Sequence, residues 1–95
     1  MGADPQSGYV IRQMRDAILD TDLKIMQLIN QRLTLVRQLR SYKEQQGIPF
    51  VDPDRERWMH EYLSGANKGP LSDPGLDAIY DELLALTKRE TNDDS

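Results

Sequence analysis

The feature that most constrains this chain is an uninterrupted stretch of about 38 residues, from Tyr9 to Gln46, that contains neither proline nor glycine. Nothing in it stops a helix, and at about 1.5 Å per residue such a helix is roughly 57 Å long. A helix of that length cannot bury its apolar side chains within a chain of 95 residues. We therefore predict one very long helix over 8–46, capped by Ser7, that packs against a second copy of the chain.

Apolar and charged residues share one seam of this predicted helix. A 4-3 repeat, the spacing that buries a helix against its partners, runs without a break through ten residues. They are Ile11, Arg15, Ile18, Asp22, Ile25, Ile29, Arg32, Val36, Leu39 and Lys43. Four of the ten are ionisable and three are basic, and burying a charge without a partner is unfavourable. The pattern predicts that a small anionic ligand meets the basic residues.

The spacing of the basic residues indicates how they would meet such a ligand. Arg32 and Lys43 lie eleven residues apart, which on a helix is a turn of about 20° and a rise of about 16.5 Å. Both side chains therefore project from the same face of the helix and could bind the two ends of a dianion. Arg15 lies roughly 25 Å from Arg32, so only an antiparallel partner helix could bring it to the same site. The alternative is that each cation lies at the rim of the bundle, paired with a carboxylate such as Asp22 or Glu82.

Glycine and proline mark the end of the long helix and the beginning of a second one. Gly47 stands just past the last turn, as is typical of a helix C-terminus. Asp52 and Pro53 have the residue types of an N-cap and a first helical residue. The second helix is predicted to reach about Ser64.

A third helix is predicted to begin with the same signal, Asp73 followed by a proline, after a loop over 65–75. No stretch has the two-residue period of a β-strand, so the predicted fold class is all-α with three helices per chain. We expect one helical domain over 8–91, with flexible ends at 1–7 and 92–95.

Composition limits the chemistry that this chain can perform. Its formal net charge of −4 argues against binding nucleic acid or an anionic membrane. It has no cysteine, one histidine and no phosphate-binding glycine loop, so we predict no metal, no cofactor and a reducing, cytoplasmic location. The histidine, His60, and four basic residues off the seam are expected to be solvated. These four are Lys24, Arg37, Arg40 and Lys88.

A series of charged residues along the first two predicted helices has the spacing of a known family. The series comprises Arg15-Asp16-Ala17-Ile18, Asp22, Leu28, Arg32, Lys43 and Asp52-Pro53-Asp54-Arg55-Glu56-Arg57. It resembles the all-helical chorismate mutases of the AroQ class, and the three-helix layout extends the resemblance over about residues 9–91. The resemblance implies an intertwined homodimer that forms a six-helix bundle with two equivalent sites.

The resemblance also implies roles for the residues of a site that two chains share. Arg15 of one chain and Arg32 of the other would bind the two carboxylates of the substrate. Lys43 would donate to the ether oxygen and to a carboxylate, and Glu56 would accept from the ring hydroxyl. The implied reaction converts chorismate into prephenate, a rearrangement that needs no base, nucleophile or cofactor.

Other positions of the implied site lie at the ends of the second and third helices. Asp52 and Arg55 would shape the entrance of the second helix, and Thr87 falls where a serine usually contacts the substrate. Thr91 departs from the family, which commonly has glutamine or glutamate there as a second donor to the breaking ether bond. Losing such a donor costs on the order of 10²-fold in rate, so we expect low activity unless Glu90 replaces it.

Three alternatives stay open. Isochorismate-pyruvate lyase and 4-amino-4-deoxychorismate mutase resemble this scaffold, and the third alternative is a non-catalytic helical dimer that regulates a larger partner enzyme. The complete series of Asp52, Arg55 and Glu56 favours the mutase over the lyase. Glu56 could, however, pair with an amine as well as with a hydroxyl, and Thr91 favours the non-catalytic alternative.

Overall fold

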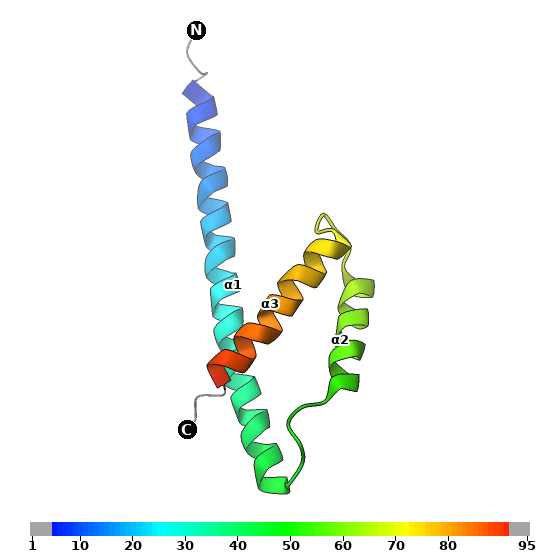
Figure 1. Ribbon diagram of the computed structural model, residues 1–95. Helices are drawn as coiled ribbons and strands as arrows, with labels where there is room; N and C mark the ends of the chain where they lie inside the picture. The colour runs from blue at the N-terminus through cyan, green and yellow to red at the C-terminus, as the bar shows by residue number, and fades with distance from the viewer. Residues whose placement is uncertain (1–4, 92–95) are drawn as a thin grey trace. The chain divides into compact units, whose positions relative to one another are not determined.

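The computed structural model describes residues 5–91, and its regular elements are all α-helices (Figure 1). Helix α1 spans Pro5–Gln46, α2 spans Pro53–Ala66 and α3 spans Asp73–Thr91. No strand occurs within the residues that the structure describes. The predicted all-α class with three helices, one of them very long, is therefore confirmed.

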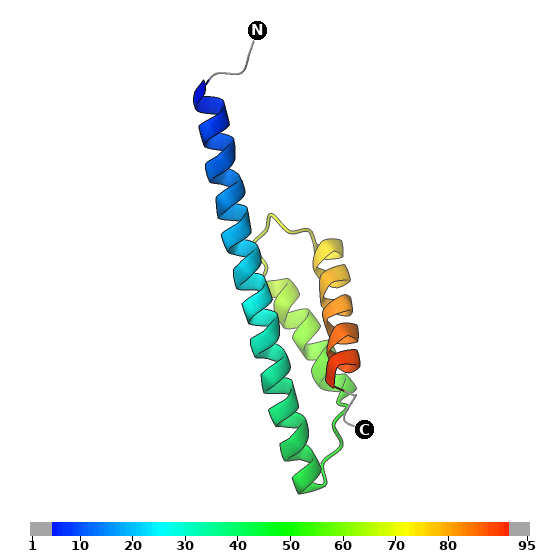
Figure 2. The same ribbon diagram turned by 90° about the vertical axis from the view of Figure 1, so that its left-hand side faces the viewer.

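The chain divides into two units, Met1–Arg32 and Leu33–Ser95. The first unit contains α1 as far as Arg32. The second contains the remainder of α1 together with α2 and α3, which can be followed by colour in Figure 2. The contacts between helices described below all lie within the second unit.

Helix α1 begins three residues earlier than predicted. Its first residue is Pro5, so Ser7 lies inside the helix and the prediction that Ser7 caps it is wrong. A proline is well tolerated at the first position, because the N–H that it lacks would have no intrahelical partner there. The rest of the ends predicted to be flexible, 1–4 and 92–95, lies outside the described residues.

Gly47 closes the C-terminus of α1, as predicted. Its φ of 68° lies in the left-handed region that glycine adopts readily. The N–H of Gly47 donates to the carbonyl of Glu44 at 3.2 Å, and the N–H of Ile48 donates to the carbonyl of Lys43 at 2.8 Å. These two bonds satisfy carbonyls that the end of the helix leaves without partners.

Asp52 caps α2, and Pro53 is the first helical residue, as predicted. The carboxylate of Asp52 accepts from the N–H of Arg55 at 3.1 Å, and its carbonyl accepts from the N–H of Glu56 at 3.1 Å. The cap therefore fixes the first turn of α2, which carries Arg55 and Glu56. The helix continues to Ala66, slightly beyond the predicted end.

Ser72, and not the predicted Asp73, caps α3. The hydroxyl of Ser72 accepts from the N–H of Gly75 at 3.1 Å, and its carbonyl accepts from the N–H of Leu76 at 2.8 Å. Asp73 is itself helical, and its negative charge is favourable in a first turn. The predicted N-cap is one residue too late because serine and aspartate are both strong N-cap residues and are adjacent here.

Helices α2 and α3 run antiparallel and are joined by the loop 67–72 (Figure 1). The loop is shorter than the predicted 65–75, because the outer glycines of that stretch lie within the helices. The side chain of Asn67 accepts from the N–H of Gly69 at 3.1 Å and donates to the carbonyl of Leu71 at 2.8 Å. One side chain thus orders the connection between the two helices.

The contact between α2 and α3 centres on His60 and Tyr80. Tyr80 is a buried hydrophobic side chain, 6% exposed, and its ring lies 5.6 Å from that of His60. The Nε2 atom of His60 lies 3.1 Å from the carboxylate of Asp77 on α3. The prediction that His60 is a solvated surface residue is therefore wrong, because it is half-buried and links the two helices.

Most large apolar side chains of the described chain are exposed. They include four members of the predicted seam of α1, which are Ile11, Ile18, Ile25 and Leu39. Within the described residues Tyr80 is the one hydrophobic side chain that is buried. Contiguous apolar surface of this kind is typical of an interface, so a single chain leaves the seam uncovered.

Candidate active site

The residues predicted to form the site are distributed over all three helices. Arg15 and Arg32 lie on α1 in the first unit, where Arg15 is exposed and Arg32 is half-buried. The other six lie in the second unit, at the end of α1, the start of α2 and the end of α3. They are Lys43, Asp52, Arg55, Glu56, Thr87 and Thr91.

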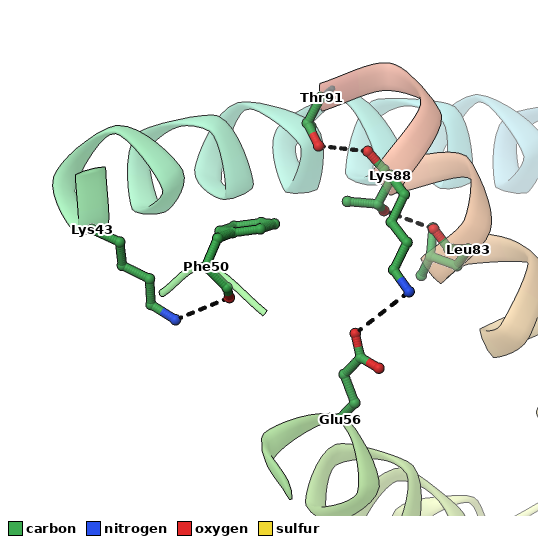
Figure 3. A network of polar contacts seen from close by, with 7 residues as sticks. Lys43, Phe50, Glu56, Leu83, Lys88 and Thr91 are labelled. Carbon is green, nitrogen blue, oxygen red and sulfur yellow. Dashed lines mark hydrogen bonds and ion pairs between the residues drawn. The ribbon is translucent and has the colours of Figure 1, made fainter. Parts of the chain in front are cut away.

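The hydroxyl groups of Thr87 and Thr91 are both engaged with the backbone of α3 (Figure 3). Thr87 donates to the carbonyl of Leu83 at 2.7 Å, and Thr91 donates to the carbonyl of Thr87 at 2.7 Å. Thr87 is 7% exposed and Thr91 is 1% exposed. A hydroxyl has a single proton to donate, so in this geometry neither threonine can donate to a ligand.

Two arginines from α1 hold the C-terminus of α3. Arg37 donates to the carbonyl of Glu90 at 2.9 Å, and Arg40 donates to the carbonyl of Thr91 at 3.1 Å. The last carbonyls of a helix lack intrahelical partners and carry partial negative charge, so cations bind there favourably. Arg37 is exposed, as predicted, whereas the prediction that Arg40 is solvated is wrong because Arg40 is half-buried. Their spacing of three residues, which places both on one face of α1, is the sequence signal that could have indicated a shared role.

Lys43 contacts the segment that links α1 to α2. Its Nζ donates to the carbonyl of Phe50 at 3.3 Å and lies 5.9 Å from the centre of the Phe50 ring. The guanidinium of Arg40 lies 5.1 Å from the same ring, so two cations flank one aromatic side chain. An ammonium has three donor hydrogens, so Lys43 can hold this carbonyl and a ligand together. Phe50 was not among the predicted site residues.

An ion pair connects the start of α2 to the end of α3. The Nζ of Lys88 lies 4.0 Å from a carboxylate oxygen of Glu56, and Figure 3 shows the lysine extending from α3 toward α2. Lys88 is exposed, as predicted, and the ion pair was not foreseen. On the same turn of α2, the guanidinium of Arg55 lies 4.6 Å from the centre of the Trp58 ring, which orients the arginine at the entrance of the helix.

The chemistry of this side-chain set is that of anion binding. Lys43 at the end of α1 binds the carbonyl of Phe50, Arg55 on α2 lies over the ring of Trp58, and Lys88 on α3 lies near the carboxylate of Glu56. Within residues 5–91 no three histidine, cysteine, aspartate or glutamate side chains are grouped so that they could hold a metal ion. None of the three described helices is both long enough and apolar enough to span a membrane.

Residues 14–92 match the family described as chorismate mutase type II. The chain belongs to the chorismate mutase type II family. The resemblance seen in the charged series of the first two helices is thereby confirmed. All eight predicted site residues of this family member, from Arg15 to Thr91, lie within the matched range.

Individual members of the family show the same similarity. A chorismate mutase from Methanocaldococcus jannaschii is 35% identical over 53 residues, which make up 56% of this chain and 54% of that protein. The match thus spans about half the length of that relative.

Two solved structures of chorismate mutase from Thermus thermophilus have the same fold. Form II superposes with a TM-score of 0.81 at 25% identity, over 90% of this chain and 97% of that one. Form I superposes with a TM-score of 0.77 at 27% identity, over 81% of this chain and 96% of that one.

Proposed function

We propose that this protein is a chorismate mutase, which converts chorismate into prephenate. The observation that carries the proposal is the family match over residues 14–92, because this range includes the whole charged series from Arg15 to Thr91. The activity named for relatives from two organisms supports it. Arginine and lysine side chains such as Arg15, Arg32 and Lys43 suit a substrate with two carboxylates.

The reaction fits the residues that the chain offers. One bond between carbon and the ether oxygen breaks while a bond between two carbons forms, within a single molecule and without proton transfer. Catalysis then consists of holding the folded conformer and placing donors where the ether oxygen gains negative charge. Lys43 is the proposed donor to this oxygen and to a carboxylate, and Glu56 is the proposed acceptor for the ring hydroxyl.

Two chains would share each site. Arg32 of one chain and Arg15 of its partner are proposed to bind the two carboxylates. Asp52 would act through the first turn of α2, since its carboxylate already accepts from the N–H of Arg55. Thr87 is the proposed contact of α3 with the substrate, and its own proton is engaged with the carbonyl of Leu83.

The proposed assembly is a homodimer whose six helices form one bundle. The support is the exposed seam of α1, with Ile11 49%, Ile18 61% and Ile25 51% exposed in a single chain. A second α1 packed on this seam would remove these side chains from water at about 25 cal/mol per Å² of apolar surface. Light scattering is expected to give about twice the chain mass of 10.9 kDa. A mass of one chain would contradict the shared site.

The test of the activity is a comparison of three substrates. Purified protein is incubated with chorismate, isochorismate and 4-amino-4-deoxychorismate, and the products are separated by chromatography. We expect prephenate from chorismate as the main product, and a large loss of this activity in Lys43→Ala. Activity on isochorismate alone would overturn the proposal.

The same test addresses the non-catalytic alternative, in which the dimer regulates a larger partner enzyme. That alternative predicts no turnover and no rise in melting temperature when chorismate is added, whereas a substrate that binds the folded state must raise it. The cytoplasmic location and the absence of a cofactor stay predictions.

A further inference from the structure

Lys88 is the one basic residue at the end of α3 that reaches the start of α2. Its Nζ lies 4.0 Å from Oε1 of Glu56, with side-chain exposures of 57% and 39% (Figure 3). The turn of α3 that carries Lys88 is held in place, because Thr87 is buried beside it and Arg37 and Arg40 bind the carbonyls that follow. Packing within the second unit therefore fixes the backbone from which Lys88 extends toward Glu56.

We propose that Lys88 makes the Glu56 corner of the site selective for a substrate whose ring carries a neutral donor, a hydroxyl, over one whose ring carries an ammonium. The inference rests on the proposed function, in which Glu56 accepts a hydrogen bond from the substituent of the ring. Glu56 alone does not discriminate between chorismate and 4-amino-4-deoxychorismate, and the proposed role of Lys88 does.

The physical argument concerns the net charge next to the ring substituent. A carboxylate by itself would favour an ammonium over a hydroxyl, because a charge-assisted bond to a cation is stronger than a bond to a neutral donor. With Lys88 at 4.0 Å, part of the negative charge of Glu56 is already offset. A substrate ammonium bound to Glu56 would lie within several ångströms of a second cation, and like charges at that separation repel.

A hydroxyl escapes this repulsion. It carries no net charge, and the carboxylate of Glu56 retains lone pairs for it while Lys88 is nearby. Arg55, one residue before Glu56 on the same turn of α2, adds further positive charge at this end of the site. The carboxylate of Asp52 is engaged with the N–H of Arg55 and balances only part of that charge.

In an alternative role, Lys88 would donate to the ether oxygen of either substrate. It would then replace the donor that Thr91 does not supply. This role predicts a different result. Removing a donor to the ether oxygen lowers turnover of both substrates by the same factor, because both have the same ether bond. Selectivity between the two substrates therefore separates the two roles.

The test is the ratio of kcat/KM for chorismate to kcat/KM for 4-amino-4-deoxychorismate at about pH 7, where an aliphatic amine is protonated. We expect the wild-type protein to favour chorismate by about tenfold or more. Lys88→Met is expected to lower the ratio by about tenfold, mainly through faster turnover of the amino substrate. Lys88→Arg keeps the charge and should keep the ratio.

The matched control is Lys68→Met, which removes one positive charge from the exposed loop between α2 and α3 and should leave the ratio unchanged. Lys88→Gln serves as a second neutral variant, and circular dichroism verifies that each variant is folded. High salt should reduce the selectivity of the wild-type protein, because the pair is partly exposed.

An unchanged ratio in folded Lys88→Met and Lys88→Gln, or an equal loss on both substrates, overturns the inference while the proposed function stands. If the wild-type protein converts neither substrate, the proposed function fails, and the inference fails with it.

Discussion

The hydroxyl of Thr91 donates to the carbonyl of Thr87 across 2.7 Å, and Thr91 is 1% exposed. The helix backbone thus takes the only proton that this side chain can donate. At a position where the family commonly has an amide or a carboxyl group, this member has a hydroxyl directed at its own helix. In the proposed site, the stabilisation of the ether oxygen then depends on the cations, and Lys43 is the proposed donor.

Thr91→Gln is expected to raise kcat for chorismate by roughly tenfold or more, because a side-chain amide adds a donor longer than the hydroxyl. Thr91→Val is the matched control, since it has nearly the same shape without the hydroxyl. It should change kcat less than about threefold, because the hydroxyl is not available to the substrate. Steady-state kinetics at equal folded concentration measure both. A large loss in Thr91→Val would show that the hydroxyl acts on the substrate.

Arg15→Ala and Lys43→Ala should each lose activity by on the order of 10²-fold or more, since each removes a charge-assisted contact. Mixing the two variants and allowing subunits to exchange forms heterodimers in which one site has both native residues. Recovery of about a quarter of wild-type activity is expected for random exchange between two-fold symmetric dimers. No recovery despite exchange demonstrated by mass spectrometry would rule out a site shared between chains.

Arg40→Met should destabilise the fold by about 1 to 2 kcal/mol, because it leaves the end of α3 without the donor that binds the carbonyl of Thr91. Methionine keeps much of the aliphatic volume beside Phe50. Urea unfolding at fixed protein concentration measures the change.

The control for Arg40→Met is Arg57→Met, which removes an exposed ion pair with Asp54, where both side chains are more than 70% exposed. Such pairs contribute about 0 to 1 kcal/mol, so the loss should be smaller. If both variants lost the same free energy of unfolding, the contact of Arg40 with α3 would stabilise the fold no more than an exposed ion pair does.

Asp52→Ala should lower the free energy of unfolding by about 1 kcal/mol, because the cap of α2 is lost, whereas Asp52→Asn should cost only a few tenths. Activity should follow the same order, since the cap fixes the turn that carries Arg55 and Glu56. Urea unfolding and chorismate turnover test both expectations. If Asp52→Asn were as inactive as Asp52→Ala, the carboxylate itself would be acting on the substrate.

Local signals predicted the ends of the helices well. Gly47 and Asp52 lie where they were expected, because a left-handed glycine and an aspartate before proline satisfy backbone groups within a few residues. The errors at Ser7 and Asp73 are also local. At Asp73 the neighbouring Ser72 caps the helix instead, and α1 begins at Pro5, which is tolerated as a first helical residue.

Contacts between helices were predicted poorly. His60 and Arg40 were expected in water, yet both are half-buried against another helix. Arg37 and Lys88 are exposed as expected, but their contacts with another helix were not foreseen. Arg37 and its acceptor on Glu90 are separated by 53 residues, and no periodicity within one helix indicates which distant carbonyl lies within reach of a long side chain.

The sequence by itself determined the three helices, most of their ends and the charged series that places the chain in its family. Those features depend on backbone preferences and on spacing along a single helix. Only the tertiary structure decided that Arg40 binds the carbonyl of Thr91 and that Lys88 lies beside Glu56. The reason is that a donor or an ion pair depends on distances of a few ångströms between groups on different turns and helices, and packing alone sets those distances.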